Sequence, residues 1–416
     1  MTGLSTDYKR GAALPSSNPF QRLASLLDGI TPAQAPIIMT IGEPQHDLPG
    51  FVKEILAANI ADFRRYPPIN GTPDFRAAVA DWLERRYDLT GLVDRENGIL
   101  PLNGSREGLS FGAIAARDQL KPDEAAPVVL LPNPFYQTYA AAAHIADAQA
   151  VLLDARAEDN FLPRLEDLDP ALLDQAVAFY VASPTNPEGH VASLDYWTQL
   201  ILLARKHNFM LFADECYSEI YRETPPAGAL EAAKALAERT GNVDPATVFD
   251  RIVVLNSLSK RSNLAGLRCG FAAGDPAFLS KWVKFRGLAA PQVPMPHQAV
   301  AAHAYRDEAH VEENRRLYNE KYAIAEELLG PILGAVTPEA GFFLWLDTSR
   351  WGSSEEVASS LWADTGVKVL PGAYLASTQA DGTNPGRNYI RIGLCAPKET
   401  TRTALTRLAT WLGERA

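Results

Sequence analysis

The sequence predicts an α/β protein in two parts, a larger domain built on a mainly parallel sheet and a smaller α+β domain. Between about residue 100 and residue 290, short apolar runs alternate with patterns of helical period. Successive runs are separated by enough chain for a crossover helix, which is typical of a parallel sheet covered on both faces. After Pro291 this alternation ends. A length of 416 residues also favours two domains over a single core.

The strands of the larger domain, expected within residues 51–290, are predicted from apolar runs without charged residues. These runs are 128–131, 177–181, 209–213, 252–255 and 269–273. Thr72, Pro73 and Asp74 predict the start of a helix, because they supply a cap, a first-turn proline and an early acid. The proline- and alanine-rich stretch 224–237 is expected to belong to a surface excursion that extends to residue 250.

The two ends of the chain are expected to differ from this central domain. Residues 1–17 are polar and contain proline and glycine, which predicts a flexible N-terminus. Residues 18–50 are expected to pack with the smaller domain and to begin with a helix capped by Asn18. The smaller domain, 291–416, is expected to contain a long helix through Glu327, a strand at 342–346, a helix near 354–365 and a strand at 389–394.

Composition excludes several classes of function. The net charge of -11 argues against nucleic acid as a partner, because phosphate backbones are bound by an excess of Lys and Arg. The three cysteines form no C-x-x-C pair, and the seven histidines have no metal-ligand spacing, so neither a disulfide framework nor a metal site is predicted. No secretory signal or membrane span is visible, and a reducing cytoplasm is the expected location.

Lys260 is the most informative residue for the chemistry. It stands just past the predicted strand at 252–255, in the run Asn256-Ser257-Leu258-Ser259-Lys260, with Arg268 shortly after. Functional groups in open α/β sheets gather at the carboxyl ends of the strands. An amine held there can attack a carbonyl, and two hydroxyls with a guanidinium form a natural phosphate site. The combination predicts a Schiff base between Lys260 and a phosphorylated aldehyde.

Three further signals each have an ordinary structural explanation beside the functional one. Asp214 follows the strand at 209–213 and either keeps a pyridine nitrogen protonated or caps a helix. Asn186 follows the strand at 177–181, in a turn fixed by two prolines, and its amide either bonds a ring oxygen or serves that turn. The turn Asn103-Gly104-Ser105-Arg106 precedes a helical pattern whose free N–H groups can hold an anion.

The joint order of these signals resembles the fold type I pyridoxal-phosphate aminotransferases of class I/II. The resemblance covers nearly the whole chain, from Ile41-Gly42-Glu43-Pro44 to Tyr389-Ile390-Arg391-Ile392-Gly393. It implies a mainly parallel seven-stranded sheet and pyridoxal 5'-phosphate as the cofactor. It also implies small amino acids and 2-oxo acids as substrates, and a homodimer.

The resemblance implies a role for each group around the cofactor. Lys260 would be the Schiff-base lysine, and Asp214 the partner of the pyridine nitrogen. Asn186 and Tyr217 would bond the ring hydroxyl oxygen, and Tyr136 would stack on the ring. The groups around the phosphate would be Ser257, Ser259, Arg268 and the backbone amides of Ser105 and Arg106.

Three residues would act on the substrate or across the subunit boundary. Arg391 would bind the substrate α-carboxylate together with Asn186, since a guanidinium can bind a carboxylate through two hydrogen bonds. Gly42 would lie in the flexible segment that closes over the substrate. Tyr66 would reach the phosphate of the neighbouring subunit. Lys260, Asp214 and Tyr217 are the expected catalytic residues, with the amine of Lys260 moving the α-proton.

Within the family, three segments resemble the succinyldiaminopimelate aminotransferases of bacterial lysine synthesis, although Ala265 stands where a proline is expected. They are 18–23, 214–221 and 258–268. These enzymes transfer an amino group from glutamate to N-succinyl-2-amino-6-oxopimelate. Because that substrate is long and polyanionic, Arg22 or Arg261 is a candidate for its distal end, and a surface role for either arginine is an equal alternative.

Other readings stay open at this point. A different class I/II aminotransferase, acting on alanine, aspartate or an aromatic amino acid, would use the same residues. A β-eliminating pyridoxal-phosphate lyase that cleaves C–S bonds would share the lysine and the carboxylate-binding arginine. A cofactor-binding transcription regulator is less favoured, because only about 17 residues precede Asn18 and the chain is acidic.

Overall fold

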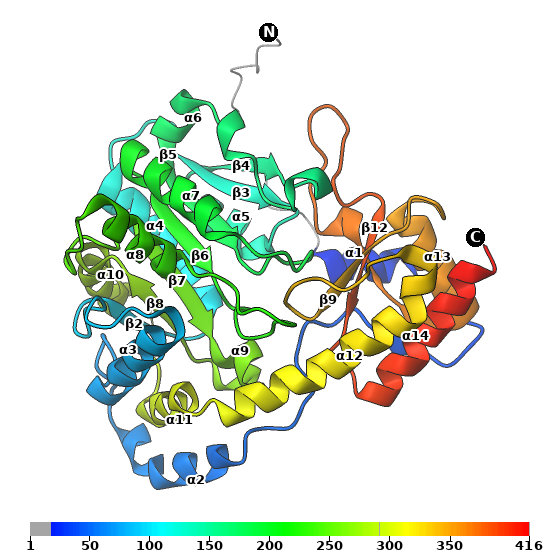
Figure 1. Ribbon diagram of the computed structural model, residues 1–416, viewed down its shortest axis with the longest axis horizontal. Helices are drawn as coiled ribbons and strands as arrows, with labels where there is room; N and C mark the ends of the chain where they lie inside the picture. The colour runs from blue at the N-terminus through cyan, green and yellow to red at the C-terminus, as the bar shows by residue number, and fades with distance from the viewer. Residues whose placement is uncertain (1–17, 291, 416) are drawn as a thin grey trace.

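The computed structural model describes residues 18–290 and 292–415, so the expected flexible segment 1–17 lies outside the described residues. Figure 1 shows a large sheet with helices on both faces and, to its right, a smaller group of strands and helices. The long helix α12 (Ala309–Leu333) connects the two groups. No helix in these described ranges combines the length and the apolar character needed to cross a lipid bilayer.

The large sheet has the strand order β2-β8-β7-β6-β5-β3-β4. Its strands are β2 (Ile99–Leu102), β3 (Val128–Asn133), β4 (Gln149–Asp154), β5 (Ala176–Ala182), β6 (Met210–Asp214), β7 (Ile252–Ser257) and β8 (Gly270–Gly274). Neighbours from β4 through β7 run parallel, and β8 runs antiparallel to both β7 and β2. The predicted α/β fold with a mainly parallel seven-stranded sheet is confirmed. The five predicted strands are present, and β2 and β4 were not predicted.

Helices bury both faces of this sheet. They are α3 (Pro73–Tyr87), α4 (Ser105–Leu120), α5 (Gln137–Ile145), α6 (Pro170–Gln175), α7 (Leu194–His207), α8 (Ala229–Thr240), α10 (Pro276–Ala289) and α11 (Met295–Arg306). Every residue of β5 is buried. Phe179 and Tyr180 of β5 belong to two different core clusters, as expected for neighbours that point to opposite faces of a strand.

Local signals explain where α3 begins. The Thr72 hydroxyl accepts a hydrogen bond from the backbone N–H of Phe75 across 3.2 Å, and Pro73 occupies the first helical position. Asp88 ends the helix in the left-handed conformation at φ 54°. The predicted start of this helix at Thr72 is therefore confirmed.

The expected surface excursion at 224–250 is wrong, because the whole of α8 lies within it and packs against α7 and β7. Leu230, Ala233 and Leu236 are buried in the larger core. Alanine is the strongest helix former, and its small side chain lets a helix pack closely, so the alanine-rich composition indicated a buried helix here.

The smaller group combines short sheets with four helices. The three-stranded sheet contains β9 (Phe343–Asp347), β11 (Leu370–Pro371) and β12 (Tyr389–Gly393), in the antiparallel order β11-β12-β9, and β1 (Ile37–Ile38) pairs in parallel with β10 (Val367–Lys368). The helices are α1 (Pro19–Leu26), α12, α13 (Ser354–Thr365) and α14 (Lys398–Gly413). The strands expected at 342–346 and 389–394 and the helix expected at 354–365 are present. α1 begins at the predicted cap Asn18, and its Leu23 packs with Leu370 and Tyr374.

The long helix predicted to run through Glu327 is two helices, α11 and α12, separated at Asp307 and Glu308. Val300 and Tyr305 of α11 pack in the core of the large sheet.

The division of the chain into domains at residues 17, 50 and 290 stays a prediction. The remaining elements are α2 (Phe51–Ala58), α9 (Leu258–Arg261), and the short 3-10 turns η1 (Ile60–Arg64), η2 (Ala157–Asp159), η3 (Leu165–Asp167), η4 (Ala265–Leu267) and η5 (Gly372–Tyr374).

Candidate active site

A cavity of about 790 Å³ opens where the carboxyl ends of β5, β6 and β7 face the smaller group of strands. Ligands in open α/β sheets bind at this end of the strands. Most residues expected at the site line this cavity: Gly42, Ser105, Arg106, Tyr136, Asn186, Asp214, Tyr217, Lys260 and Arg391. The structure therefore brings together residues that lie up to 349 positions apart in the sequence, from Gly42 to Arg391.

Lys260 lies on α9, the single helical turn that follows β7. Its Nζ donates a hydrogen bond to the backbone carbonyl of Gly42, and the Lys260 side chain passes near the ring of Phe342. Burial lowers the pKa of the Lys260 ammonium, and the nearby Cys395, Cys216 and Glu43 only partly oppose that shift. A lysine with a lowered pKa is present to a larger extent as the free amine near neutral pH, and only the free amine can act as a nucleophile or accept a proton.

Asp214 is the last residue of β6 and is buried. Its Oδ2 accepts a hydrogen bond from the Tyr139 hydroxyl across 2.8 Å, and its Oδ1 accepts one from the backbone N–H of Cys216 across 3.3 Å. Burial raises the pKa of the Asp214 carboxyl, and the hydrogen bonds from Cys216 and Tyr139 oppose that shift. A buried carboxylate of this kind is stabilised by a cationic group placed opposite it.

Arg391 lies in the middle of β12 and is only 5% exposed. Its Nη1 donates to Asn186 Oδ1 across 3.3 Å, its Nη2 donates to the carbonyl of Thr40 across 3.2 Å, and its guanidinium lies over the ring of Phe343. Burial lowers the pKa of Arg391 to about 10.

The Arg391 guanidinium can donate further hydrogen bonds to a bound anion. Its Nε has no hydrogen-bond partner within the described part of the chain, and no carboxylate there lies within ion-pair distance of it. A buried cation without a counter-ion is costly, so such groups are normally paired. A ligand carboxylate would supply the missing charge and the second hydrogen bond.

An anion-binding arrangement lies beside Lys260, at the start of α4. Gly104 precedes the helix at φ 78° without a side-chain cap, so the first N–H groups of α4 are available. Arg268 approaches so closely that a Cβ on Gly104 would lie 2.2 Å from its Nη2. The Ser257 hydroxyl donates to the Ser259 hydroxyl across 2.9 Å. Ser257, Ser259 and Arg268 are not among the residues that line the cavity.

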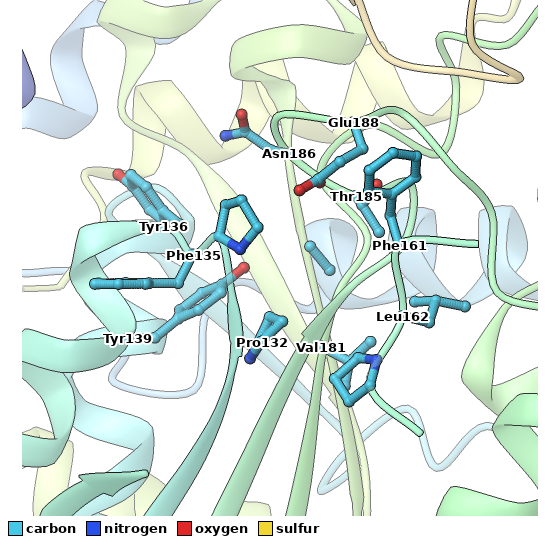
Figure 2. Close-up of a pocket in the computed structure, with 13 residues that line it drawn as sticks. Pro132, Phe135, Tyr136, Tyr139, Phe161, Leu162, Val181, Thr185, Asn186 and Glu188 are labelled. Atoms are coloured by element: carbon cyan, nitrogen blue, oxygen red, sulfur yellow. The ribbon is translucent and has the colours of Figure 1, made fainter. Parts of the chain in front are cut away.

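Aromatic side chains form one wall of the site. Figure 2 shows Tyr136 and Tyr139 on one side of an adjoining small pocket, with Phe161 on the opposite side and Asn186 at the top of the view. Arg106 Nε donates to the Tyr136 hydroxyl across 3.0 Å. Glu188 also faces this pocket; it is buried, and its Oε1 has no partner among the described residues.

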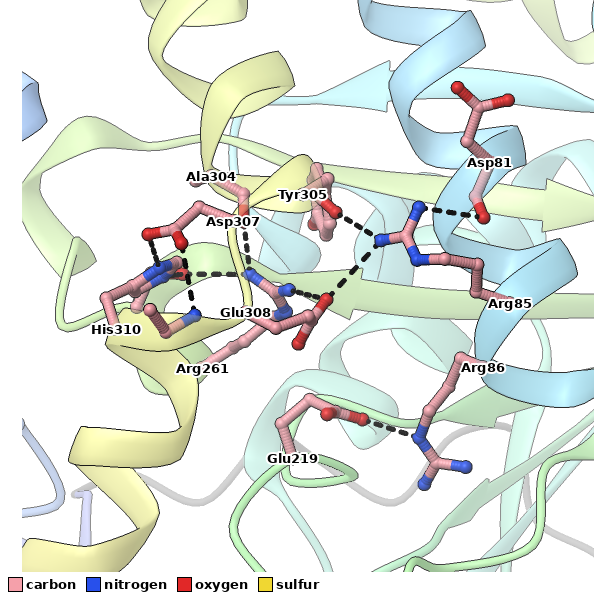
Figure 3. A network of polar contacts seen from close by, with 12 residues as sticks. Asp81, Arg85, Arg86, Glu219, Arg261, Ala304, Tyr305, Asp307, Glu308 and His310 are labelled. Carbon is pink, nitrogen blue, oxygen red and sulfur yellow. Dashed lines mark hydrogen bonds and ion pairs between the residues drawn. The ribbon is translucent and has the colours of Figure 1, made fainter.

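Two residues singled out in the sequence lie away from the cavity. Tyr66 is 97% exposed and contacts no part of the site in a single chain. Arg261 is buried in the network of Figure 3, where it pairs with Glu308 across 2.8 Å and donates to the carbonyl of Ala304. The hypothesis that Arg261 binds the distal end of the substrate is therefore wrong, because its guanidinium points away from the cavity toward Glu308.

The sequence reasoning missed two groups at the site. Tyr139 was not assigned a role, because its position in the first turn of α5 gives no sign that it reaches Asp214. Phe343 packs under the Arg391 guanidinium and against Gly42, where an added Cβ would lie 2.8 Å from its ring. In the sequence, two consecutive aromatic residues at the start of a predicted strand, Phe342 and Phe343, could have indicated that an aromatic side chain contributes to the site.

Residues 36–408 match the family model "Aminotransferase class I and II". The chain belongs to the class I and II aminotransferases. Members of this family use pyridoxal phosphate, as the sequence resemblance implied. The predicted family, fold type and cofactor are thereby confirmed.

Individual relatives of this aminotransferase agree with that assignment. A crystal structure of an aminotransferase from Neisseria meningitidis is 35% identical, with a TM-score of 0.87 over 95% of this chain and 98% of that one. A probable N-succinyldiaminopimelate aminotransferase from Thermus thermophilus is 25% identical, with a TM-score of 0.79 over 94% of this chain and 100% of that one. LL-diaminopimelate aminotransferase of Maridesulfovibrio salexigens is 29% identical over 90% of each chain.

The residues present fit the chemical groups of pyridoxal phosphate. An aldehyde requires an amine, and Lys260 supplies one whose pKa is lowered. A ring nitrogen that is to stay protonated requires a buried carboxylate, which Asp214 supplies. A phosphate requires N–H groups and a guanidinium, which the start of α4 and Arg268 supply.

Proposed function

We propose that this aminotransferase carries out its reaction with Lys260 as both the covalent anchor of the cofactor and the acid-base catalyst. When bound, pyridoxal phosphate supplies an aldehyde for amine exchange and an electron-withdrawing ring that stabilises negative charge at the substrate α-carbon. The observation that carries the proposal is the joint placement of Lys260, Asp214 and an unpaired Arg391 on one cavity.

Each residue has a defined task in this scheme. Asp214 holds a proton on the pyridine nitrogen, and Tyr139 holds Asp214 in place. Asn186 accepts from Arg391 through Oδ1, which leaves its Nδ2 hydrogens for the ring oxygen, and Tyr217 binds the same oxygen. Arg391 binds the substrate α-carboxylate, which orients the α-hydrogen toward Lys260. Lys260 would take that proton at its Nζ and would return it to the carbon on the other side of the transferred nitrogen, which comes from the cofactor aldehyde.

The remaining site residues bind the cofactor or enclose the substrate. Ser105, Arg106, Ser257, Ser259 and Arg268 hold the phosphate, and Tyr136 packs against the ring. Gly42 approaches Lys260 with its carbonyl, and its lack of a side chain allows the close contact with Phe343. This segment, residues 41–43, forms part of the cavity wall.

We propose N-succinyl-LL-diaminopimelate as the amino donor for 2-oxoglutarate in the reverse direction, and hence succinyldiaminopimelate aminotransferase as the specific activity. The similarity to the Thermus thermophilus protein and the matching segments at 18–23 and 258–268 support this substrate. Arg106 is the exposed basic residue that lines the cavity, so it is placed to meet the distal carboxylates. Arg22 lies over Tyr374, 3.8 Å from the ring centroid, outside the set of lining residues.

LL-diaminopimelate is a second candidate substrate, and Glu43 favours it. The distal end of that molecule carries a free ammonium, which the succinylated compound lacks. Glu43 is an exposed acid on the cavity wall and is suited to bind such an ammonium. The similarity to LL-diaminopimelate aminotransferase supports the same candidate.

A direct kinetic comparison of the two compounds tests which of them is the substrate. The purified enzyme with cofactor is supplied with 2-oxoglutarate and either N-succinyl-LL-diaminopimelate or LL-diaminopimelate, and glutamate formation is measured. We expect a higher kcat/KM for the succinylated compound, and a loss of that preference in Arg106→Gln. A preference for LL-diaminopimelate that disappears in Glu43→Gln would assign the second candidate. Equal, negligible rates with both compounds, beside fast turnover of aspartate or alanine, would exclude both.

We also propose that the enzyme is a homodimer of the cytoplasm. Exposed apolar side chains gather around the 60–69 segment: Ile60, Phe63, Tyr66, Ile69 and Leu288. Leu288 is 93% exposed, and its neighbour Gly287 lies against Ile69. An apolar surface of this kind is typical of a subunit interface.

The state of the cysteines supports the proposed compartment. The three cysteines are buried and unpaired, as expected in a reducing compartment.

A further inference from the structure

A chain of partly buried hydrogen bonds connects the wall of the cavity to the backbone of Lys260. His46 follows the cavity-lining segment 41–43, and its Nδ1 lies 2.7 Å from Oδ1 of Asn314. The Nδ2 of Asn314 donates to the carbonyl of Lys260 across 3.1 Å and to the carbonyl of Arg261 across 3.2 Å. Asn314 is 2% exposed. Figure 1 shows that the chain leading into α2 passes beneath α12, which carries Asn314.

Lys321 holds the other side of the His46 ring. Its Nζ lies 2.8 Å from Nε2 of His46 and donates to the carbonyl of Leu394 across 3.0 Å. Leu394 directly follows β12, the strand that carries Arg391. Lys321 is buried, and no carboxylate of the described residues pairs with it. Asn314, Tyr318 and Lys321 recur at spacings of four and three on one face of α12, with the Tyr318 ring packed against His46.

These contacts determine the tautomer of His46. Because Asn314 donates through Nδ2, its Oδ1 must accept, so the hydrogen lies on Nδ1 of His46. The Lys321 ammonium can only donate, so Nε2 of His46 must carry the lone pair below about pH 8, the value to which burial lowers the pKa of Lys321. A second proton on the ring would place an N–H against the Lys321 ammonium. The network is therefore complete only while His46 is neutral.

The charges around His46 act in both directions. Burial and the Lys321 ammonium lower the pKa of His46, whereas its bond to Asn314 and the acids Asp47 and Glu313 raise it. Asp47 and Glu313 are exposed, and Glu313 is paired with Arg316 across 2.7 Å, so water and that arginine screen them. The buried Lys321 lies on the unscreened side of the ring.

We propose that His46 is a positioning residue that ties the 41–43 segment to the Lys260 turn through Asn314, and that releases the segment when its ring takes up a proton. The inference rests on the proposed function, because it treats Lys260 as the reacting amine. It adds a group that contacts neither cofactor nor substrate. It predicts that ordered coverage of the cavity is lost in mild acid, before Lys260 itself is altered.

Backbone hydrogen exchange of the 39–49 segment tests this in the cofactor-loaded enzyme, with rates corrected for the intrinsic effect of pH. In the wild type we expect protection against exchange to fall at least about tenfold between about pH 7 and about pH 5, because burial lowers the pKa of His46 and its protonation therefore requires more acid than that of an exposed histidine. His46→Phe should have low protection at both pH values. His46→Gln can still accept from Lys321 and cannot titrate, so its protection should stay the same across this range. The exposed His144→Phe on α5 is the matched control and should follow the wild type.

A charge variant separates titration from packing. Lys321→Met removes the neighbouring cation, so the midpoint of the loss of protection should move up by about one pH unit, whereas Lys321→Arg should leave it in place. In the pH profile of kcat/KM, the fall on the acidic side should shift by the same amount as the midpoint of the loss of protection. Protection that is independent of pH in the wild type, or unchanged in His46→Phe, would overturn the inference. Absence of transamination in the wild type would instead refute the proposed function, since the exchange measurement does not depend on turnover.

Discussion

Tyr139 donates its hydroxyl hydrogen to Oδ2 of Asp214 across 2.8 Å, inside the core of the large sheet. The bond joins the first turn of α5 to the end of β6, two elements that are separated in the sequence by β4, α6, β5 and α7. Because hydrogen bonds to a carboxylate favour its ionised form, Tyr139 opposes the upward shift that burial imposes on the pKa of Asp214. The Asp214 carboxylate thus depends on a residue that never has to touch the substrate.

Tyr139→Phe is expected to weaken cofactor binding and slow turnover together. Loss of a hydrogen bond to a charged group costs about 1.5–3 kcal/mol, which corresponds to roughly a 10- to 100-fold decrease in kcat/KM. Tyr180→Phe is the matched control, because Tyr180 stacks on Tyr139 and bonds the carbonyl of Leu109 instead. Titration of each apoenzyme with pyridoxal phosphate, followed by steady-state kinetics, gives both readouts. Equal effects in the two variants would show that Tyr139 contributes only to packing.

Arg391→Lys is expected to raise KM for the amino acid substrate by roughly 10- to 100-fold and to leave cofactor binding nearly unchanged. Lysine keeps the charge but cannot bind a carboxylate through two parallel hydrogen bonds, and it would also lose the contact over Phe343. Steady-state kinetics with glutamate check the first expectation, and cofactor titration checks the second. A normal KM would remove Arg391 from the carboxylate site.

Glu188→Gln is expected to change how stability depends on pH. Burial raises the pKa of Glu188 from 4.5 to about 8, and the nearby Arg391 only partly opposes the shift. The folded protein therefore binds more protons than the unfolded chain between these values, so the wild type loses stability as pH rises from about 4.5 to about 8. The loss reaches at most about 1.4 kcal/mol per pH unit.

Glutamine cannot ionise, so the free energy of unfolding of Glu188→Gln should not fall with pH in this way. Relative to the wild type, the variant should become more stable as pH rises from about 4.5 to about 8. Urea unfolding midpoints at several pH values within it measure the effect. The exposed Glu223→Gln serves as the control and should follow the wild type. A constant difference between Glu188→Gln and the wild type at all pH values would show that Glu188 is ionised in the folded protein throughout.

Phe63→Glu is expected to dissociate the proposed dimer, because it places a charge in the exposed apolar surface around Tyr66. Leu202→Glu, at a similarly exposed position on α7, is the control. Sedimentation velocity should show monomers only for Phe63→Glu, with a loss of activity that follows dissociation. A wild-type enzyme that sediments as a fully active monomer would contradict the dimer and the role of Tyr66.

The sequence predicted the centre of the large sheet because β3, β5, β6, β7 and β8 are apolar runs. It did not predict β2 or β4, since Pro101 interrupts one and the half-buried edge strand 149–154 mixes polar and apolar residues. Residues at strand ends, such as Asp214 and Lys260, were placed correctly because strand ends converge. Directions of side chains could not be predicted, which is why Arg261, next to Lys260, was one of two candidates for the distal end of the substrate although it pairs with Glu308.

The proposal that Lys260 holds the cofactor covalently is tested most directly by reducing the holoenzyme with borohydride and mapping the labelled peptide. We expect pyridoxyl label on Lys260 alone, and a Lys260→Ala variant that keeps its fold but loses the visible absorbance and the label. A label on another lysine, or unreduced cofactor released from a wild-type enzyme that still transaminates, would contradict the assignment.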